Sequence, residues 1–239
     1  MLSGKIHGIS FIKQIGIIFF CVICLISVSQ ARDGELKTSP LAVAFGSHPT
    51  FMSLSLSPDG DKVAFVQYHP DGFYFVRILD LTTNKLSNVI LTTGKNGTEI
   101  SRCFWANHER LLCREKKRDS RHGIYFYLSR LVGVNDNGKD IKVLNGMVID
   151  FLPDDPNHVL IELAAKDLEQ FYWERKTRVG SLDIYTGKIV YQTGLQSNAV
   201  QWISDGHGVP RLYYSINRRY RRWYIRKPEG SSVFWKVKI

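Results

Sequence analysis

The residues with the most specific chemistry in this sequence are Cys103 and Cys113, which bracket the stretch "CFWANHERLLC". A hairpin centred on His108 would place the two cysteines directly opposite one another, so that they could form a disulfide in an oxidising compartment. Directly opposed strand positions strain such a bridge, and two buried thiols would explain the pair equally well. The sequence leaves both possibilities open.

The histidines give little indication of catalysis or of metal binding. After residue 31 they occur singly, mostly beside expected turns, and never as a His-x-x-x-His pair: they are His48, His69, His108, His122, His158 and His207. The segment "GKNGT" at 94–98 lacks the Gly-x-x-x-x-Gly-Lys spacing of a phosphate-binding loop. We therefore assign no catalytic, cofactor-binding or metal-binding residue and expect no cofactor.

The elements that would position these side chains are hairpins that recur about every 48 residues. The copies are "LSLSPDGDKVAFV" from Leu54, "CFWANHERLLCRE" from Cys103, "IDFLPDDPNHVLIEL" from Ile149 and "VQWISDGHGVPRLYYS" from Val200. Each has an apolar strand, a turn rich in Asn, Asp, Pro or Gly, and a second strand of β-branched and aromatic residues. The chain is therefore built from repeats.

A second strand–turn–strand element follows each hairpin. These elements are "VRILDLTTNK" at 76–85, "LSRLVGVNDNGKD" at 128–140, "VGSLDIYTGK" at 179–188 and "WYIRKPEGSS" at 223–232. Four antiparallel strands per repeat are typical of a β-propeller blade. The sequence therefore predicts an all-β fold, a partial β-propeller of about four four-stranded blades, at about 51–93, 99–145, 148–194 and 199–238.

Packing between blades should bury both faces of the middle strands, and we place Trp105, Trp202, Phe73 and Phe126 there. No helix is expected after residue 31, except that the insertion at 165–178 could form a loop or a single helical turn.

The N-terminus has the pattern of a secretory signal peptide. Lys5 and Lys13 precede an apolar run at 15–28, and Ser29-Gln30-Ala31 offers the small residues of a cleavage site. The run is about 14 residues long, short of the ~20 that span a bilayer. We predict a signal helix within 1–31 that is cleaved after Ala31, a lead-in at 32–50 and a propeller portion at 51–239. The mature protein would be periplasmic or secreted and free of the membrane.

The formal charge is +10, and much of the excess lies in "RLYYSINRRYRRWYIRK" at 211–227. Arginines interleaved with aromatics can bind nucleic acid. An exported protein rarely meets nucleic acid, so we expect no such partner and favour a hairpin. Its turn would lie near Asn217–Tyr220, with aromatics on one face and arginines on the other.

Several of these segments together resemble a known family. They are "SPLAVAFGSHPTF" at 39–51, "FMSLSLSPDGDKVAFV" at 51–66, "FWANHERLLCRE" at 104–115, "VGSLDIYTGK" at 179–188 and "WISDGHGVPRLYY" at 202–214. Over about residues 39–238 the chain resembles the N-terminal propeller of the prolyl oligopeptidase family of serine peptidases, in particular its exported bacterial acylaminoacyl-peptidase and dipeptidyl-peptidase-like members. The resemblance implies a propeller of seven or eight blades that gates an α/β-hydrolase domain carrying a Gly-x-Ser-x-Gly nucleophile elbow.

The sequence departs from that family in two respects. It has no Gly-x-Ser-x-Gly, since "GSL" at 180–182 falls in an expected strand and "GHG" at 206–208 in a turn, so no residue of the catalytic triad is carried over. It also has four blades. We expect a truncated propeller that is inactive alone and that self-associates through the uncovered apolar faces of its first and last blades. The alternative is a standalone periplasmic propeller that binds a peptide or protein through its loops.

Overall fold

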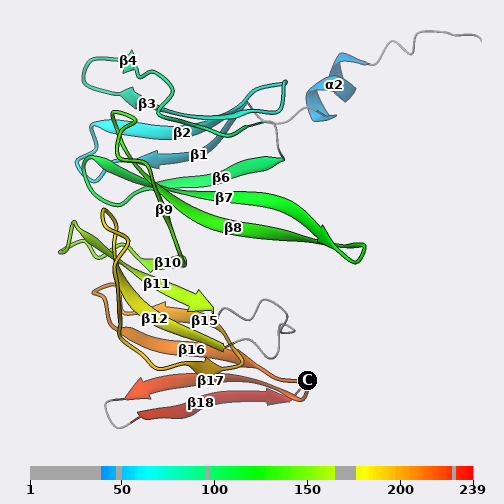
Figure 1. The fold of residues 1–239 in the computed structure, drawn as a ribbon, viewed down its shortest axis with the longest axis vertical. Helices are drawn as coiled ribbons and strands as arrows, with labels where there is room; N and C mark the ends of the chain where they lie inside the picture. The colour runs from blue at the N-terminus through cyan, green and yellow to red at the C-terminus, as the bar shows by residue number, and fades with distance from the viewer. Residues whose placement is uncertain (1–38, 47–49, 95–96, 165–175, 228–229, 239) are drawn as a thin grey trace, which may run out of the picture. The chain divides into compact units, whose positions relative to one another are not determined.

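The computed structural model describes residues 39–46, 50–94, 97–164, 176–227 and 230–238 (Figure 1). The chain divides into two compact units, Met1–Ser47 and His48–Ile239. The signal peptide predicted for residues 1–31 lies outside the described residues, and no described helix is long and apolar enough to cross a membrane.

The described part of the first unit is a short helix, α2 (Pro40–Gly46). Pro40 occupies the first helical position, where its fixed φ suits the helix and its missing N–H is not needed. The backbone N–H of Val43 donates to the carbonyl of Ser39 at 3.0 Å and closes the first turn. The expectation that the lead-in has no helix was therefore wrong, because a proline start followed by Leu, Ala, Val and Phe is sufficient for two turns.

Four antiparallel sheets make up the second unit, and we call them blades 1 to 4 in chain order (Figure 1). Blade 1 consists of β1 (Phe51–Leu56), β2 (Lys62–Tyr68), β3 (Tyr74–Asp80), β4 (Lys85–Leu86) and β5 (Leu91–Thr92). Blade 2 consists of β6 (Thr98–Trp105), β7 (Arg110–Arg121), β8 (Ile124–Asn135) and β9 (Lys142–Leu144).

Blade 3 consists of β10 (Met147–Asp150), β11 (His158–Ala164), β12 (Lys176–Asp183), β13 (Ile189–Tyr191) and β14 (Gln196–Ser197). Blade 4 consists of β15 (Ala199–Ser204), β16 (Pro210–Ile216), β17 (Tyr220–Lys227) and β18 (Gly230–Lys238). The prediction of four antiparallel blades is confirmed, with one refinement: the short β5 and β14 add a fifth strand to blades 1 and 3. The end of the expected insertion, 176–178, belongs to β12, and residues 165–175 lie outside the described part of the chain.

Consecutive blades pack face to face, and each has a front face toward the preceding blade and a back face toward the next. The core between blades 1 and 2 includes Val66 and Val76 from the back of blade 1 and Trp105 from the front of blade 2. Equivalent cores join blade 2 to blade 3 and blade 3 to blade 4. The indole of Trp105 donates to the carbonyl of Ser55 at 3.0 Å. The burial of Trp105 and Trp202 between blades is confirmed.

Two other aromatic predictions were wrong. The hairpin of β7 and β8 extends past its neighbours (Figure 1), so Ile124, Tyr125 and Tyr127 near its tip are exposed and Phe126 is only half-buried. Phe73 stacks on Phe75, with ring centroids 6.2 Å apart, on the strand face directed away from blade 2. A strand sequence predicts alternation, but it does not show how far the neighbouring blade reaches.

The basic segment of blade 4 does form a hairpin, whose turn is closed by a hydrogen bond from Asn217 N to Tyr220 O at 3.0 Å. The predicted separation of aromatics from arginines was wrong. Strand β17 places Trp223 and Arg221 on one face and Tyr224 and Arg222 on the other, because both residue types occur in adjacent pairs.

Candidate functional site

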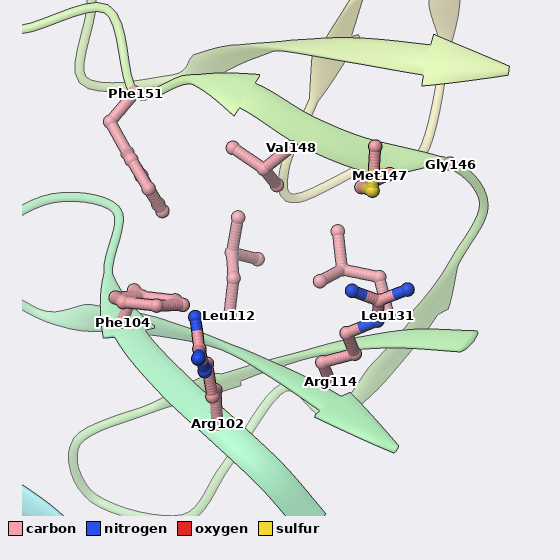
Figure 2. A pocket seen from close by; sticks show the side chains of 9 residues that line it. All are labelled: Arg102, Phe104, Leu112, Arg114, Leu131, Gly146, Met147, Val148 and Phe151. Carbon is pink, nitrogen blue, oxygen red and sulfur yellow. The ribbon is translucent and has the colours of Figure 1, made fainter. Parts of the chain in front are cut away.

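A cavity of about 250 Å³ lies between the back of blade 2 and the first strand of blade 3 (Figure 2). Its lining residues are Arg102 and Phe104 of β6, Arg114 and Leu112 of β7, Leu131 of β8, and Gly146, Met147, Val148 and Phe151 at and beside β10. The two blades thus contribute opposite walls of one small site.

The walls of this cavity are apolar. Leu112 and Leu131 belong to the core that joins blades 2 and 3, so the cavity borders directly on well-packed side chains. The rings of Phe104 and Phe151 meet across the two blades, with centroids 5.7 Å apart. Phe104 lies in β6 and Phe151 directly follows β10, so the shape of the site is largely fixed by the fold.

Gly146 allows the chain to enter β10 close to its neighbour β11. Its φ is +103°, a conformation that side chains disfavour. A Cβ at this position would lie 2.8 Å from Cδ1 of Ile161 and 3.1 Å from the carbonyl oxygen of Glu162. Any larger residue would therefore push the wall formed by Met147 and Val148 out of place.

Two arginines provide the polar side of the cavity. Arg102 and Arg114 are directly opposite one another in the register of β6 and β7. Both are exposed, and both reach the cavity from the wall that carries Leu112 and Leu131, facing Met147 and Val148 (Figure 2). Like charges at directly opposed strand positions destabilise a sheet. An anion between the two guanidinium groups would relieve this repulsion.

The positive charge of the pair is not neutralised by carboxylates in the described part of the chain. The Nε of Arg114 donates to the Ser129 hydroxyl at 2.8 Å, which leaves its terminal nitrogens available. The adjacent carboxylate, Glu115, is buried and is held by Arg130. Among the described residues neither Arg102 nor Arg114 forms an ion pair.

This arrangement is suited to binding and not to covalent chemistry. A guanidinium group donates parallel hydrogen bonds to a carboxylate, and the adjacent apolar walls would accept a hydrocarbon group. The nine lining residues include no hydroxyl or imidazole that could serve as a nucleophile or a base.

The disulfide lies on the other face of the same two strands. Cys103 and Cys113 are bonded, with their Cα atoms 4.0 Å apart, and both are buried in the core between blades 1 and 2. The N–H of Cys103 donates to the Ser53 hydroxyl of blade 1 at 3.0 Å, so it points away from β7. The bridge joins β6 to β7 one residue from the paired Arg102 and Arg114, and therefore fixes their register.

His69, His108, His158 and His207 lie at or next to turns, each beside an aspartate, whereas His122 lies at the tip of the β7–β8 hairpin and His48 lies outside the described residues. Nδ1 of His158 is 2.9 Å from Asp155, and Nδ1 of His108 is 3.3 Å from Asp59. The hydrogen bond with His158 lowers the pKa of Asp155 below its ordinary value. In the described ranges no serine hydroxyl bonds to a histidine, and no three His, Cys, Asp or Glu side chains gather as a metal site.

Sequence reasoning missed the arginine pair, although a signal for it was present. The hairpin centred on His108 that pairs Cys103 with Cys113 also pairs the preceding Arg102 with the following Arg114. Phe151 could not be found in this way, because it comes from another blade and the contact depends on how the blades pack.

A scan against protein families and a search of curated proteins find no match to this chain. Solved structures do match. The acylaminoacyl peptidase of Pyrococcus horikoshii is 15% identical with a TM-score of 0.50, over 78% of this chain and 32% of that one. The β-propeller domain of the Trilobed protease from Pyrococcus furiosus is 15% identical with a TM-score of 0.50, over 77% and 56%.

Oligogalacturonate lyase from Vibrio parahaemolyticus, a different class of enzyme, is 10% identical with a TM-score of 0.51, over 80% of this chain and 55% of that one. This chain thus spans about a third of the peptidase and about half of the other two proteins. At such identities the likeness defines the fold alone. The described residues form four blades of a partial β-propeller, and the predicted resemblance to peptidase propellers holds at the level of the fold.

Proposed function

We propose that this chain is a peptide-binding propeller module of the prolyl oligopeptidase type, which holds a peptide but does not hydrolyse it. The observation that carries the proposal is the pair Arg102 and Arg114, exposed, opposite one another and without a carboxylate partner in the described residues, at the edge of an apolar cavity. The ligand would be the carboxylate end of a peptide whose last side chain is apolar.

The size and chemistry of the cavity support this ligand. Its volume of about 250 Å³ is below the ~300–1,000 Å³ of sites for whole small molecules, which favours one terminal residue over a larger group. The terminal carboxylate would lie between the two guanidinium groups and the side chain against Leu112 and Leu131. Binding would be placed between blades, and not at the loops to which the sequence hypothesis assigned it.

The absence of hydrolysis is part of the proposal. Peptide hydrolysis needs a nucleophile, a base and an oxyanion hole. The sequence contains no Gly-x-Ser-x-Gly, and the histidine rings of His108 and His158 contact aspartates at turns. Propeller folds that resemble this one occur in peptidases and in a lyase, so the fold does not itself supply an activity.

Binding is tested with the full 239-residue chain and a fluorescent pentapeptide that ends in Phe. We expect the free carboxylate form to bind and the C-terminal amide to bind at least about 10-fold more weakly, because a hydrogen bond to a charged group contributes about 1.5–3 kcal/mol. Arg102→Met should weaken binding of the carboxylate form by about 10-fold or more and leave that of the amide unchanged.

The matched control is Arg118→Met, which removes an exposed arginine of the same hairpin outside the cavity and should leave both affinities unchanged. Equal binding of the carboxylate and amide forms, or an Arg102→Met variant as tight as the unchanged chain, would contradict the site. Mass spectrometry of the same mixtures should recover the peptide intact. Cleavage blocked by an active-serine phosphonylating reagent would contradict the proposed lack of activity.

A further inference from the structure

Every interface between blades in this chain is of one kind, the back face of one blade against the front face of the next. Among the described residues, the front of blade 1 and the back of blade 4 pack against no other blade. No core cluster of the described residues includes either of them. Both faces are nevertheless apolar.

The front of blade 1 consists of the residues that alternate, along its strands, with those buried on the back face. They are Phe51, Leu56, Val63, Phe65, Phe75, Leu79 and Leu86. Phe51 and Phe65 are in edge contact, with centroids 5.3 Å apart; Phe65 is 7% exposed, whereas Phe51 and Leu56 in β1 are each 58% exposed. Arg77 lies in the same face, directly opposite Phe65.

The back of blade 4 is richer still in aromatic groups. Its apolar members are Ile203, Leu212, Tyr214, Trp223, Ile225 and Trp235, and Gln201 and Arg221 lie on the same face. Tyr214 and Trp223 pack together, with centroids 4.7 Å apart, and Trp235, which pairs with Trp223, is 59% exposed. An indole side chain with this exposed fraction indicates a contact surface.

The two blades also differ in charge. Residues 199–238 contain nine Lys and Arg against two Asp and Glu, whereas residues 51–93 contain three against four. Two copies of blade 4 would repel one another, while blade 4 and blade 1 attract. Arg77 would meet the aromatic rings of blade 4, a contact with a precedent between blades 2 and 3, where the Arg110 guanidinium lies 4.7 Å from the Tyr185 ring centroid.

We propose that two copies of this chain join head to tail into a closed ring of eight blades, the back of blade 4 in each copy against the front of blade 1 in the other. This contact repeats the pairing that the chain uses within itself. Eight blades lie within the range of about four to eight that propellers adopt. A head-to-tail contact forms a ring when its rotation closes, and here closure would need two copies. The inference does not depend on the peptide site.

The first test is the mass in solution of the full chain, measured by light scattering during gel filtration at micromolar concentration. We expect a dimer. Trp235→Glu and Leu56→Glu should each raise the dimer dissociation constant by at least about 100-fold, because each buries a charge in both contacts of the ring. The matched control is Ile124→Glu, another exposed apolar residue, near the tip of the β7–β8 hairpin, which should leave the dimer intact.

The decisive test mixes the two variants. A Trp235→Glu copy and a Leu56→Glu copy can still form one contact made only of unchanged residues, so the mixture should recover a dimer that neither variant forms alone. Recovery would also show that both variants are folded. A monomeric unchanged chain, polymers longer than a dimer, or a dimer that survives Leu56→Glu would each overturn the proposal, the last because it indicates a contact between two copies of blade 4.

Discussion

Replacing Arg110 with methionine measures how strongly blades 2 and 3 are joined. Arg110 is fully buried, and its side chain makes three hydrogen bonds. Nε donates to the carbonyl of Ile184 in blade 3 at 3.0 Å, and the terminal nitrogens donate to Oδ1 of Asn135 at 2.6 Å and to the carbonyl of Asp140 at 3.1 Å. The guanidinium also lies against the Tyr185 ring.

Methionine fills most of the same space but donates nothing, so three buried acceptors lose their partner. A buried acceptor without a partner costs about 1–3 kcal/mol, and the loss of one member of a buried charged network costs about 3–5 kcal/mol. We expect a net loss of about 3 kcal/mol, because three neutral acceptors lose their partner while the variant is spared the cost of desolvating the guanidinium group. Since whole domains are stable by about 5–15 kcal/mol, Arg110→Met should lose a large part of the total.

Urea unfolding followed by tryptophan fluorescence gives the free energy of unfolding. The control is Lys139→Met, which removes an exposed cation from the nearby turn and should change stability by less than about 0.5 kcal/mol. Gly133→Ala is a second probe, because its Cβ would lie 2.7 Å from a terminal nitrogen of Arg110 and should displace the same group. An Arg110→Met variant within about 0.5 kcal/mol of the unchanged chain would refute this account of the interface.

Two further predictions concern the disulfide and the turns. Converting both Cys103 and Cys113 to alanine should lower the free energy of unfolding by about 2–3 kcal/mol, as expected for a loop of 10 residues, and reductant should then have no further effect; a change below about 0.5 kcal/mol in urea unfolding would contradict this. Hydrogen bonds, the largest from Thr82, lower the pKa of Asp80 to about 2, from 3.8, so its stabilisation is complete above about pH 4 and is lost as the pH falls through about 2. Asp80→Asn should therefore lower the melting temperature more at pH 7 than at pH 2, and an equal loss at both would refute the assignment.

The repeat pattern was sufficient to predict the blades because strand alternation and turn chemistry are local. Each turn is specified by its own residues, as at Asp80, and each strand by its period of two. Contacts between blades are not local. The meeting of Phe104 with Phe151, and the exposure of Tyr125 at a hairpin tip, depend on how far one sheet extends over the next.

The candidate site shows the same division. Its arginine pair follows from the hairpin register that the cysteines suggested, since Arg102 and Arg114 flank Cys103 and Cys113. Its opposite wall comes from blade 3, and nothing in the sequence near Gly146 indicates that this segment faces β6 and β7. The repeat therefore predicts the fold, whereas the site arises only from the packing of two repeats.

The measurement that tests the central claim most directly is a crystal structure of the full chain with a peptide ending in Phe and a free carboxylate. The account predicts the carboxylate between the guanidinium groups of Arg102 and Arg114, with the phenyl ring against Leu112 and Leu131 and the peptide uncleaved. A peptide bound at the blade loops with the cavity empty, or a carboxylate that contacts neither arginine, would contradict it.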